Sequence, residues 1–332
     1  FGGSGFIGTF FAVKLLEESK YKKVYIVDKE NIEEKSCHFR DNLFMKYKDY
    51  ICFINHDVRD EIKFDLDDEI GLIANFAAIH REPGHEDHEY FETNLHGAKN
   101  ICAWAEKISC KKVLFTSSIS PYGLSEEARD ETSLTVPVSA YGSSKLASEE
   151  IHKTWHAKSN DRRLIIVRPG VVFGPSEGGN VSRLIKAVLG RYFFYMGNRE
   201  TRKAGIYVKE LTNAMYWVMF DEKANSQSMI IFNGTMNPGP SIEEYVDVVC
   251  KVAKVNRYVP NLPHFILLYA SHLISFFMSP FGINHPFSPV RINKLVRSNN
   301  IIPSYLLEKK YNYKFTLFEA FEDWKESYPE EW

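Results

Sequence analysis

The sequence predicts an α/β fold in which helices cover both faces of a doubly wound parallel sheet, followed by a smaller, discontinuous C-terminal lobe. Three observations lead to this prediction. Short β-branched runs alternate with helical patterns through the first half of the chain. The second half is less regular and is rich in Pro, Gly and aromatic residues. The chain has 332 residues, 44% hydrophobic and 25% charged, which is typical of a globular protein with a sizeable core.

The alternation of elements can be followed along the chain. A strand that leads through a helix into the next parallel strand makes a right-handed crossover, which places the helices on the faces of the sheet. The predicted helices are Thr9–Ser19, Tyr90–Ile108 and Ala140–His156, and the predicted strands are Val24–Val27, Ile51–Asn55, Leu72–Ala78, Lys112–Thr116 and Leu164–Arg168.

The sequence opens at Phe1, inside a turn that in such folds joins a strand to a helix. We expect the strand before this turn to be missing from the sequence, because a parallel sheet without its central strand leaves buried backbone groups unpaired. We assign 1–173 to a first domain and 174–332 mainly to a lobe that builds a substrate pocket. Part of 206–232 is expected to return to the first domain.

Charge and cysteine content exclude several classes of protein. The formal net charge is −2 and the basic residues are spread along the chain, whereas a nucleic-acid-binding protein needs a basic face. None of the five cysteines forms a C-x-x-C pair or stands at zinc-finger spacing from histidines, so we predict no metal site. We expect reduced thiols and a cytoplasmic protein.

One apolar stretch approaches the length of a membrane span. From Leu262 to Ile283 there is no Asp, Glu, Lys or Arg, although the stretch contains Pro263, His272 and Pro280. We therefore favour a buried or surface-lying helix over a span. Contact with lipid or with the inner face of a membrane stays open.

A glycine-rich turn stands at the start of the first predicted helix. Gly2, Gly5 and Gly8 in GGSGFIG allow a tight turn, a close approach of the backbone to a pyrophosphate, and close packing of the helix on the sheet. The helix N-terminus then offers free N–H groups to phosphates. We predict that these glycines, together with Phe6 and Ile7, bind a dinucleotide.

Three further positions extend this cofactor site. Asp28 ends the next strand, at the spacing where a carboxylate accepts hydrogen bonds from ribose hydroxyls and repels a 2′-phosphate, so NAD is preferred over NADP. Asp57-Val58 is predicted to contact adenine, and Ala77-Ala78 to lie along the cofactor. For Asp28 the alternative is a cap or turn residue, and for the others it is loop packing.

The chemistry is predicted to come from Tyr141 and Lys145, a Y-x-x-x-K pair that shares one helix face. The Lys145 ammonium and a cationic nicotinamide are expected to lower the pKa of Tyr141. The tyrosine then serves as general base toward a hydroxyl or general acid toward a ketone. Ser118, at the end of a strand, is expected to hold the reacting oxygen; alternatively it is a cap or turn serine.

In these motifs the chain resembles the extended short-chain dehydrogenase/reductases of the nucleotide-sugar epimerase/dehydratase group, which have a Rossmann-like domain. The resemblance extends past Pro175 into the second half. The matching segments are GGSGFIG, VYIVD, HDV, NFAA, NLHG, FTSSISPYG, YGSSK, RPGVVFGP, GNVSRLIKA and IYVKEL.

The resemblance implies roles for individual residues. Ser118, Tyr141 and Lys145 match the family's catalytic set, and Asn94 matches an asparagine near the nicotinamide. Asn94, Tyr141 and Lys145 are thereby also expected to bind the cofactor. The implied substrate-binding residues are His80, Arg81, Asn180, Lys203 and Arg291. For Lys203 and Arg291 the alternative is a surface charge, and for Asn180 it is a helix cap. The resemblance also implies a homodimer joined through the helices Tyr90–Ile108 and Ala140–His156.

Two departures from the family pattern concern the substrate. Val171 stands where relatives usually have an asparagine that contacts the diphosphate, and Lys203-Ala204-Gly205 replaces a usual R-D-F. These changes resemble a bacterial subgroup of epimerases that act on N-acetylglucosamine linked by diphosphate to a polyprenyl lipid. Such a substrate would give the stretch Leu262–Ile283 a purpose.

The function that we predict is 4-epimerisation of a diphosphate-linked sugar by transient oxidation at carbon 4, with NAD as cofactor. A 4-ketosugar reductase needs the same three residues and is the alternative. A dehydratase is disfavoured because Ser118 is followed by Ile119-Ser120 rather than by an Asp-Glu pair. A cofactor-sensing protein without catalysis is the third reading, although Tyr141 and Lys145 are both intact.

Overall fold

The computed structural model describes residues 1–29, 38–82, 84–124, 127–224, 227–263 and 298–332, with isolated positions between 265 and 278. Arg291 and much of Leu262–Ile283 lie outside the described residues. Within the described ranges, no helix combines the length and the apolar character that crossing a bilayer requires. Cys52, Cys102, Cys110 and Cys250 are unpaired thiols.

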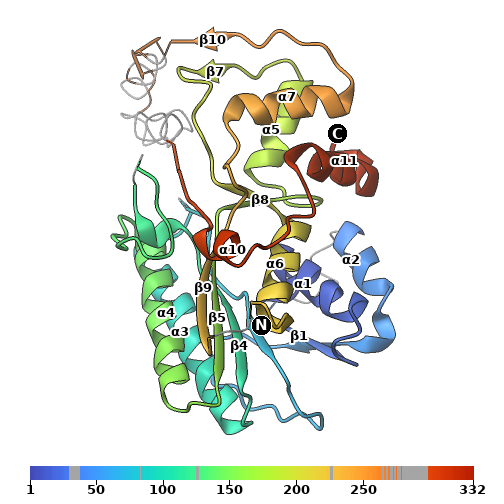
Figure 1. The fold of residues 1–332 in the computed structure, drawn as a ribbon, viewed down its shortest axis with the longest axis vertical. Coiled ribbons are helices and arrows are strands. Elements are labelled where there is room, and N and C mark those ends of the chain that lie inside the picture. The colour runs from blue at the N-terminus through green and yellow to red at the C-terminus, as the bar shows by residue number, and fades with distance from the viewer. Residues whose placement is uncertain are drawn as a thin grey trace.

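The centre of the protein is a parallel sheet of four strands in the order β3-β4-β5-β9 (Figure 1). β4 and β5 carry runs of apolar residues that are buried on both sides, as expected for the middle of a parallel sheet. The strands are β3 (Ile73–Asn75), β4 (Lys112–Thr116), β5 (Arg163–Pro169) and β9 (Met229–Gly234).

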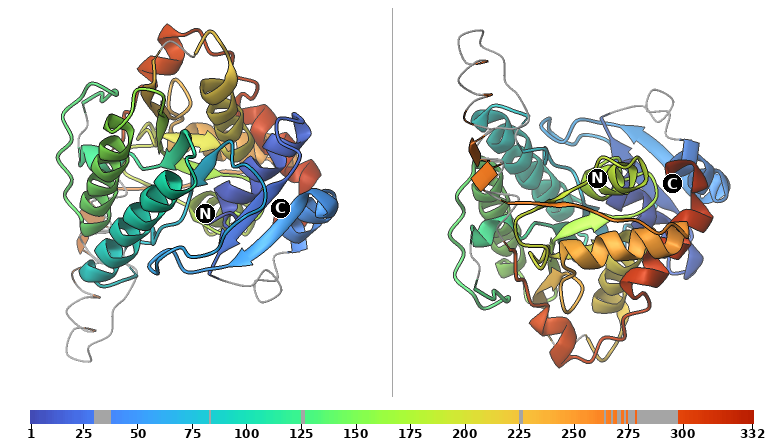
Figure 2. Two further views of the ribbon diagram at one scale, coloured as in Figure 1. Left: turned by 90° about the horizontal axis from the view of Figure 1, so that it is seen from below. Right: turned by 90° about the horizontal axis from the view of Figure 1, so that it is seen from above.

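Helices cover both faces of this sheet. On one face, α3 (Asp87–Lys107) and α4 (Ala140–Ala157) pack against the side chains of Val113 and Ile166. On the other face, α1 (Phe6–Glu17) and α6 (Val208–Phe220) pack against the alternate residues of the same strands. The predicted doubly wound α/β fold is therefore confirmed (Figure 2).

The boundaries differ from the predictions where the chain turns toward the candidate site. The helix predicted from Thr9 begins at Phe6, because the amide of Thr9 already donates to the carbonyl of Gly5 at 3.0 Å. The strand predicted over Leu72–Ala78 ends at Asn75, whose side-chain oxygen accepts a hydrogen bond from the amide of Ala77. β4 matches its predicted bounds.

A second, two-stranded parallel sheet joins β1 (Val24–Asp28) and β2 (Ile51–Asn55). Phe1 links the two sheets, because its amino group donates to the carbonyl of Ala74 and its carbonyl accepts from the amide of Phe76, while the amide of Gly2 donates to the carbonyl of Val27.

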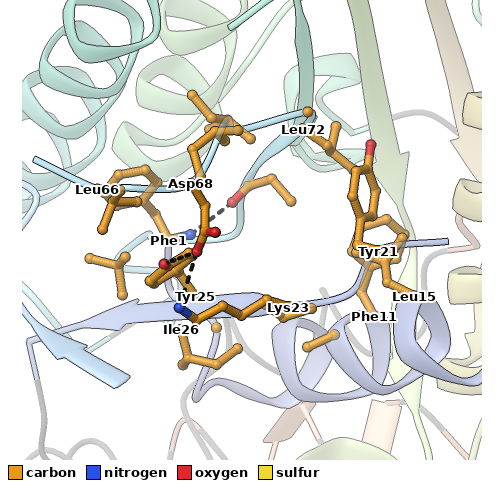
Figure 3. Close-up of a pocket in the computed structure, with 18 of the residues that line it drawn as sticks. Phe1, Phe11, Leu15, Tyr21, Lys23, Tyr25, Ile26, Leu66, Asp68 and Leu72 are labelled. Atoms are coloured by element: carbon orange, nitrogen blue, oxygen red, sulfur yellow. Dashed lines mark hydrogen bonds and ion pairs between the residues drawn. The ribbon is translucent and has the colours of Figure 1, made fainter. Parts of the chain in front are cut away.

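A cavity of about 300 Å³ lies between β1 and β3 and is lined mainly by apolar residues such as Phe11 and Trp104 (Figure 3). Among the lining residues, Lys23, which precedes β1, and Tyr25 of β1 both donate hydrogen bonds to the carboxylate of Asp68. The lining includes Gly3 and Gly8 of the glycine-rich turn but none of Ser118, Tyr141 and Lys145.

The second half of the chain builds a smaller lobe beyond the sheet (Figure 1). Its core gathers α5, α7 and α11 around an aromatic cluster that includes Phe173 and Trp324. β9 and α6 belong to the central sheet and its cover, whereas the division at 173/174 stays a prediction. The remaining elements are α2 (His38–Met45), β6 (Val171–Phe173), α5 (Asn180–Leu189), β7 (Tyr195–Met196), β8 (Gly205–Tyr207), α7 (Ile242–Ala253), β10 (Asn261–Leu262), α10 (Ser304–Glu308), α11 (Leu317–Ser327) and the 3₁₀ turns Lys48–Tyr50, Ser120–Tyr122 and Pro329–Glu331.

Candidate active site

The glycine loop is shaped by contacts between backbone atoms. Gly2 has φ +69°, and a Cβ there would lie 2.6 Å from the amide nitrogen of Ala77. A Cβ on Gly8 would lie 2.6 Å from the carbonyl oxygen of Gly2. A Cβ on Gly5 would meet only the carbonyl oxygen of Gly2, at 3.1 Å, so the other side of Gly5 is open. The loop therefore packs tightly on the protein and presents a bare backbone outward.

The N-terminus of α1 completes a cradle for an anion. Gly5 is the N-cap, no side chain caps the helix, and the first turn holds no acidic residue. The first helical N–H with a partner in the turn is that of Thr9, which leaves the amides of Phe6, Ile7 and Gly8 as donors. Free amides at a positive helix end suit a pyrophosphate, so these residues fit a dinucleotide.

Asp28 lies beside this loop at the end of β1. Its Oδ2 accepts hydrogen bonds from the hydroxyl and the amide of Ser4, at 2.5 and 3.3 Å. Oδ1 has no partner within the described residues. The carboxylate is thus held against the loop with one oxygen available for a ribose, as the predicted NAD preference requires.

We expect Asp28→Asn to weaken NAD binding about tenfold, because a hydrogen bond to a charged acceptor contributes about 1.5–3 kcal/mol and part of it remains with the amide. Removal of the negative charge is expected to improve NADP binding. Fluorescence titration with NADH and NADPH measures both affinities, with Asp65→Asn, an exposed position, as control. An unchanged ratio of the two affinities would contradict the role of Asp28.

Asp57 and Val58 have contacts with the protein itself. The guanidinium of Arg59 bonds the Asp57 carboxylate, with Nη2 to Oδ2 at 2.6 Å, and holds the pKa of Asp57 below its ordinary value. Val58 is buried against α3, where a Cβ on Gly97 would lie 2.9 Å from it. Loop packing accounts for both positions, and contact with adenine stays a prediction.

Asn94 fixes the chain that follows the alanine pair. Its side-chain oxygen accepts from the amide of Ile79 at 2.9 Å, and its side-chain nitrogen donates to the carbonyl of Ile79 and to the hydroxyl of Ser144. Asn94 is buried, and it joins the segment with Ala77 and Ala78 to helix α4. The structure thus gives it a positioning role, and a direct contact with nicotinamide stays a prediction.

The three predicted catalytic residues come together from two elements. Ser139 caps α4 by accepting from the amide of Gly142, which places Tyr141 in the first turn and Lys145 one turn later. Ser118 follows β4 and lies close enough to Tyr141 for its hydroxyl to oppose the raising of the pKa of the phenol. The backbone amide of Ser120 donates to the Ser118 hydroxyl at 3.1 Å and holds it in place.

Burial dominates the charges of this group. It raises the pKa of Tyr141 to about 12, with Ser118 opposing, and it lowers the pKa of Lys145 to about 7. The net direction here is thus a raised pKa of Tyr141, while the lowering expected from Lys145 together with a bound nicotinamide stays a prediction. The reason is that removal from water disfavours the phenolate and the ammonium alike. Lys145 is 2% exposed, and its Nζ lies 4.6 Å from the centre of the Phe115 ring.

Two predicted substrate residues lie near this group. His80 and Arg81 are exposed, after β3. The carbonyl of Arg81 accepts from the hydroxyl of Tyr90, whose ring centre is 6.0 Å from that of Tyr141. The structure therefore brings the backbone of this segment beside the tyrosine.

The other predicted substrate residues are more dispersed. Asn180 is exposed at the start of α5, where its side-chain oxygen accepts from Arg183, while Glu177 caps the helix by accepting from the amides of Val181 and Ser182. Asn180 is thus not the N-cap. Burial lowers the pKa of Lys203 to about 8, so it is not a simple surface charge.

A buried ion pair that the sequence did not predict lies behind Lys145 on α4. Glu149 follows Lys145 by one helical turn, and Arg168 lies near the end of β5. The signal available in the sequence was Arg168, the charged residue of the predicted strand Leu164–Arg168.

The chain is similar in sequence to known epimerases. The sequence model of the NAD dependent epimerase/dehydratase family matches residues 1–233. The chain is 28% identical over 302 residues to the N-acetyl-α-D-glucosaminyl-diphospho-ditrans,octacis-undecaprenol 4-epimerase of Escherichia coli O157:H7, covering 88% of this chain and 83% of the relative. It is 24% identical over 276 residues to the UDP-glucose 4-epimerase of Halalkalibacterium halodurans, covering 76% and 78%.

Solved structures share the fold along the full length. UDP-glucuronic acid 4-epimerase from Bacillus cereus, in complex with UDP-glucuronic acid and NAD, has a TM-score of 0.73 at 19% identity and covers 100% of this chain and 98% of its own. The UDP-Glc/GlcNAc 4-epimerase from Campylobacter jejuni has a TM-score of 0.71 at 17% identity and covers 98% and 97%.

Proposed function

The chain belongs to the NAD dependent epimerase/dehydratase family, and we propose that it inverts carbon 4 of an N-acetylhexosamine carried on a diphosphate. NAD is its cofactor. The observation that carries the proposal is that Ser118 lies beside Tyr141, one helical turn before Lys145 on α4, in a fold shared with 4-epimerases. The Escherichia coli relative, a 4-epimerase of an N-acetylglucosaminyl diphosphate, supports the sugar class.

The residues of the chain divide the chemistry among them. Ser118 holds the 4-oxygen of the sugar beside Tyr141, and the phenol of Tyr141 takes the proton from the 4-hydroxyl and later returns it. Lys145 in its charged form stabilises the phenolate. The glycine loop and Asp28 would hold NAD, which when bound would supply a reversible hydride acceptor for carbon 4, so that no net cofactor would be consumed.

The test is to incubate the protein with NAD⁺ and N-acetylglucosamine diphosphates and to analyse the released sugar by chromatography. A 4-epimer that appears without accumulation of NADH supports the proposal. Consumption of NADH with a 4-ketosugar, without epimerisation, contradicts it and indicates a reductase. Binding of NAD without turnover of any such substrate indicates a cofactor sensor.

We further propose that the carrier is a polyprenyl diphosphate. The two departures from the family pattern, distant in sequence, lie side by side: Val171 pairs with Gly205 in parallel strands, and its amide donates to the carbonyl of Ala204 at 2.8 Å. The change at Val171 removes a polar side chain, and the change at Gly205 removes a bulky one. The two changes therefore alter one place where β6 and β8 pair, which supports a carrier other than a nucleotide.

The carrier is tested by comparing turnover of UDP-linked and undecaprenyl-diphosphate-linked N-acetylglucosamine. We expect kcat/KM to favour the lipid carrier. Val171→Asn is expected to reduce the ratio of kcat/KM for the lipid-linked sugar to kcat/KM for the UDP-linked sugar. Val172→Asn, one position along the same strand, is expected to leave this ratio unchanged. A preference for the UDP-linked sugar would overturn the lipid proposal and leave the epimerase intact.

A lipid carrier entails work at a membrane surface, and we propose peripheral association at its cytoplasmic face. Phe265 and Tyr269, in the apolar stretch, are about 70% exposed. Co-sedimentation with phospholipid vesicles tests this association.

We also propose a homodimer through α3 and α4, which pack on each other and leave Phe91 exposed. Light scattering after gel filtration measures the mass in solution.

A further inference from the structure

The buried ion pair of Glu149 and Arg168 is an unusual feature for the middle of a protein. Glu149 is 0% and Arg168 4% exposed. The guanidinium donates from Nε to Oε1 at 2.9 Å and from Nη2 to Oε2 at 2.6 Å. A buried pair contributes little net stability compared with apolar residues of the same shape, because both charges are removed from water. Its presence therefore calls for another reason.

The pair is joined to the end of β4. The hydroxyl of Ser117, the residue before Ser118, donates to Glu149 Oε1 at 2.5 Å. On its other side Arg168 donates to the hydroxyl of Tyr122 at 2.9 Å, and that hydroxyl donates to Asn233 of β9. Both carboxylate oxygens of Glu149 thus have partners, and they hold it between Ser117, which follows β4, and Arg168 of β5.

Glu149 also interacts with Lys145 through its charge, without a direct ion pair between them. Four residues apart on α4, the two side chains share one face, with Cβ atoms about 5–6 Å apart. Both are almost fully buried, so their charges interact without much screening. Glu149 supplies the anion that acts on Lys145.

Other ionisable groups lie near Lys145 and near Tyr141, one turn before it. Those near Tyr141 are Glu82 and Tyr90. The groups around Lys145 are Tyr141, Glu149 and His152 on α4, His80 after β3, and Arg168 on β5 behind Glu149.

We propose that Glu149 is a positioning residue for the reaction, which keeps the Lys145 ammonium charged inside the dry site, and that Arg168 and Ser117 hold Glu149 in place for that purpose. The proposal rests on the proposed role of Lys145 in epimerisation. It assigns the ion pair to the charge state of the active site rather than to fold stability.

The direction of the effect follows from the charges. Burial lowers the pKa of Lys145 to about 7, and Glu149 opposes this lowering. Without Glu149 the pKa of Lys145 falls further. The ammonium is present below that pKa and is lost as the pH rises through it, so the loss of Glu149 removes activity first at the alkaline side.

The first experiment uses protein labelled with [ε-¹³C]lysine, with the Lys145 signal assigned by Lys145→Met. We expect Glu149→Gln to move the titration midpoint of Lys145 down by roughly one pH unit, the size typical of a close opposite charge. Glu150→Gln is the matched control, because Glu150 is exposed and pairs with Lys153 at the surface. An unchanged midpoint in Glu149→Gln would overturn the proposal.

The second experiment follows kcat for the epimerisation against pH. Glu149→Gln is expected to move the alkaline limb to lower pH by the same amount, whereas a purely structural role lowers kcat equally at all pH values. Since Glu149→Gln leaves Arg168 unpaired, Glu149→Gln with Arg168→Met is measured beside it and is expected to show the same direction of shift. If the Lys145 titration midpoint shifts in Glu149→Gln but the parent protein shows no epimerase activity, the result supports the effect of Glu149 on Lys145 and counts against the proposed function.

Discussion

Replacement of Tyr141 by phenylalanine is expected to lower kcat for the epimerisation by about 10²–10⁴-fold, the range that a general acid–base group contributes. The side chain keeps its ring and loses only the hydroxyl that Ser118 contacts. NAD affinity and the melting temperature are expected to change little, because the glycine loop and Asp28 do not depend on this hydroxyl. Steady-state kinetics and NADH titration measure the two quantities.

The matched control for this substitution is Tyr90→Phe. Tyr90 lies beside Tyr141, and its hydroxyl donates to the backbone carbonyl of Arg81 rather than to a reacting group. It is expected to cost about 1 kcal/mol of stability, the value of one hydrogen bond, with a far smaller change in kcat. Equal losses of kcat in the two variants would show that Tyr141 is not the acid–base group.

Gly8→Ala is expected to have the second large effect, on both stability and NAD binding. The new Cβ would lie 2.6 Å from the Gly2 carbonyl oxygen and 2.7 Å from the Gly3 Cα, and both are backbone atoms. Neither can rotate aside, so the loop must move and with it the donors for the pyrophosphate. We expect a loss of about 1–3 kcal/mol of unfolding free energy, as for other overpacked sites, and a fall of at least about tenfold in NAD affinity.

The control for Gly8 is Gly84→Ala, where the nearest atoms to a Cβ belong to Arg81 at 3.7 Å, an ordinary contact. Urea unfolding and NADH titration apply to both variants. If Gly8→Ala unfolds at the same urea concentration as the parent protein and binds NAD equally well, the tight packing of the loop does not govern the site.

Local patterns predicted much of the fold. β2 and β4 have the bounds expected from their apolar runs. For β4 the reason is that a buried parallel strand is a continuous apolar segment, whereas β2 is exposed at alternate residues. The start of α1 and the end of β3 were missed by a few residues. Hydrogen bonds within the turns decide both boundaries. The bond from Thr9 to Gly5 fixes where α1 begins, and the bond from Ala77 to Asn75 fixes where β3 ends.

The candidate site was predictable to the same extent. The glycine loop and the pair Tyr141 and Lys145 depend on spacings within a few residues, which the sequence displays directly. The direction of the pKa of Tyr141 was not predictable, because it depends on how completely packing removes the phenol from water.

By itself the sequence determined the fold class, the NAD loop and the tyrosine–lysine helix, since each follows from local periodicity and residue type. Only the tertiary structure decided that Ser118 meets Tyr141, that Val171 lies beside Gly205, and that Arg168 holds Glu149 behind Lys145. These contacts join residues far apart in the chain, and their energies come from burial and charge pairing, which exist only once the sheet and its helices have packed.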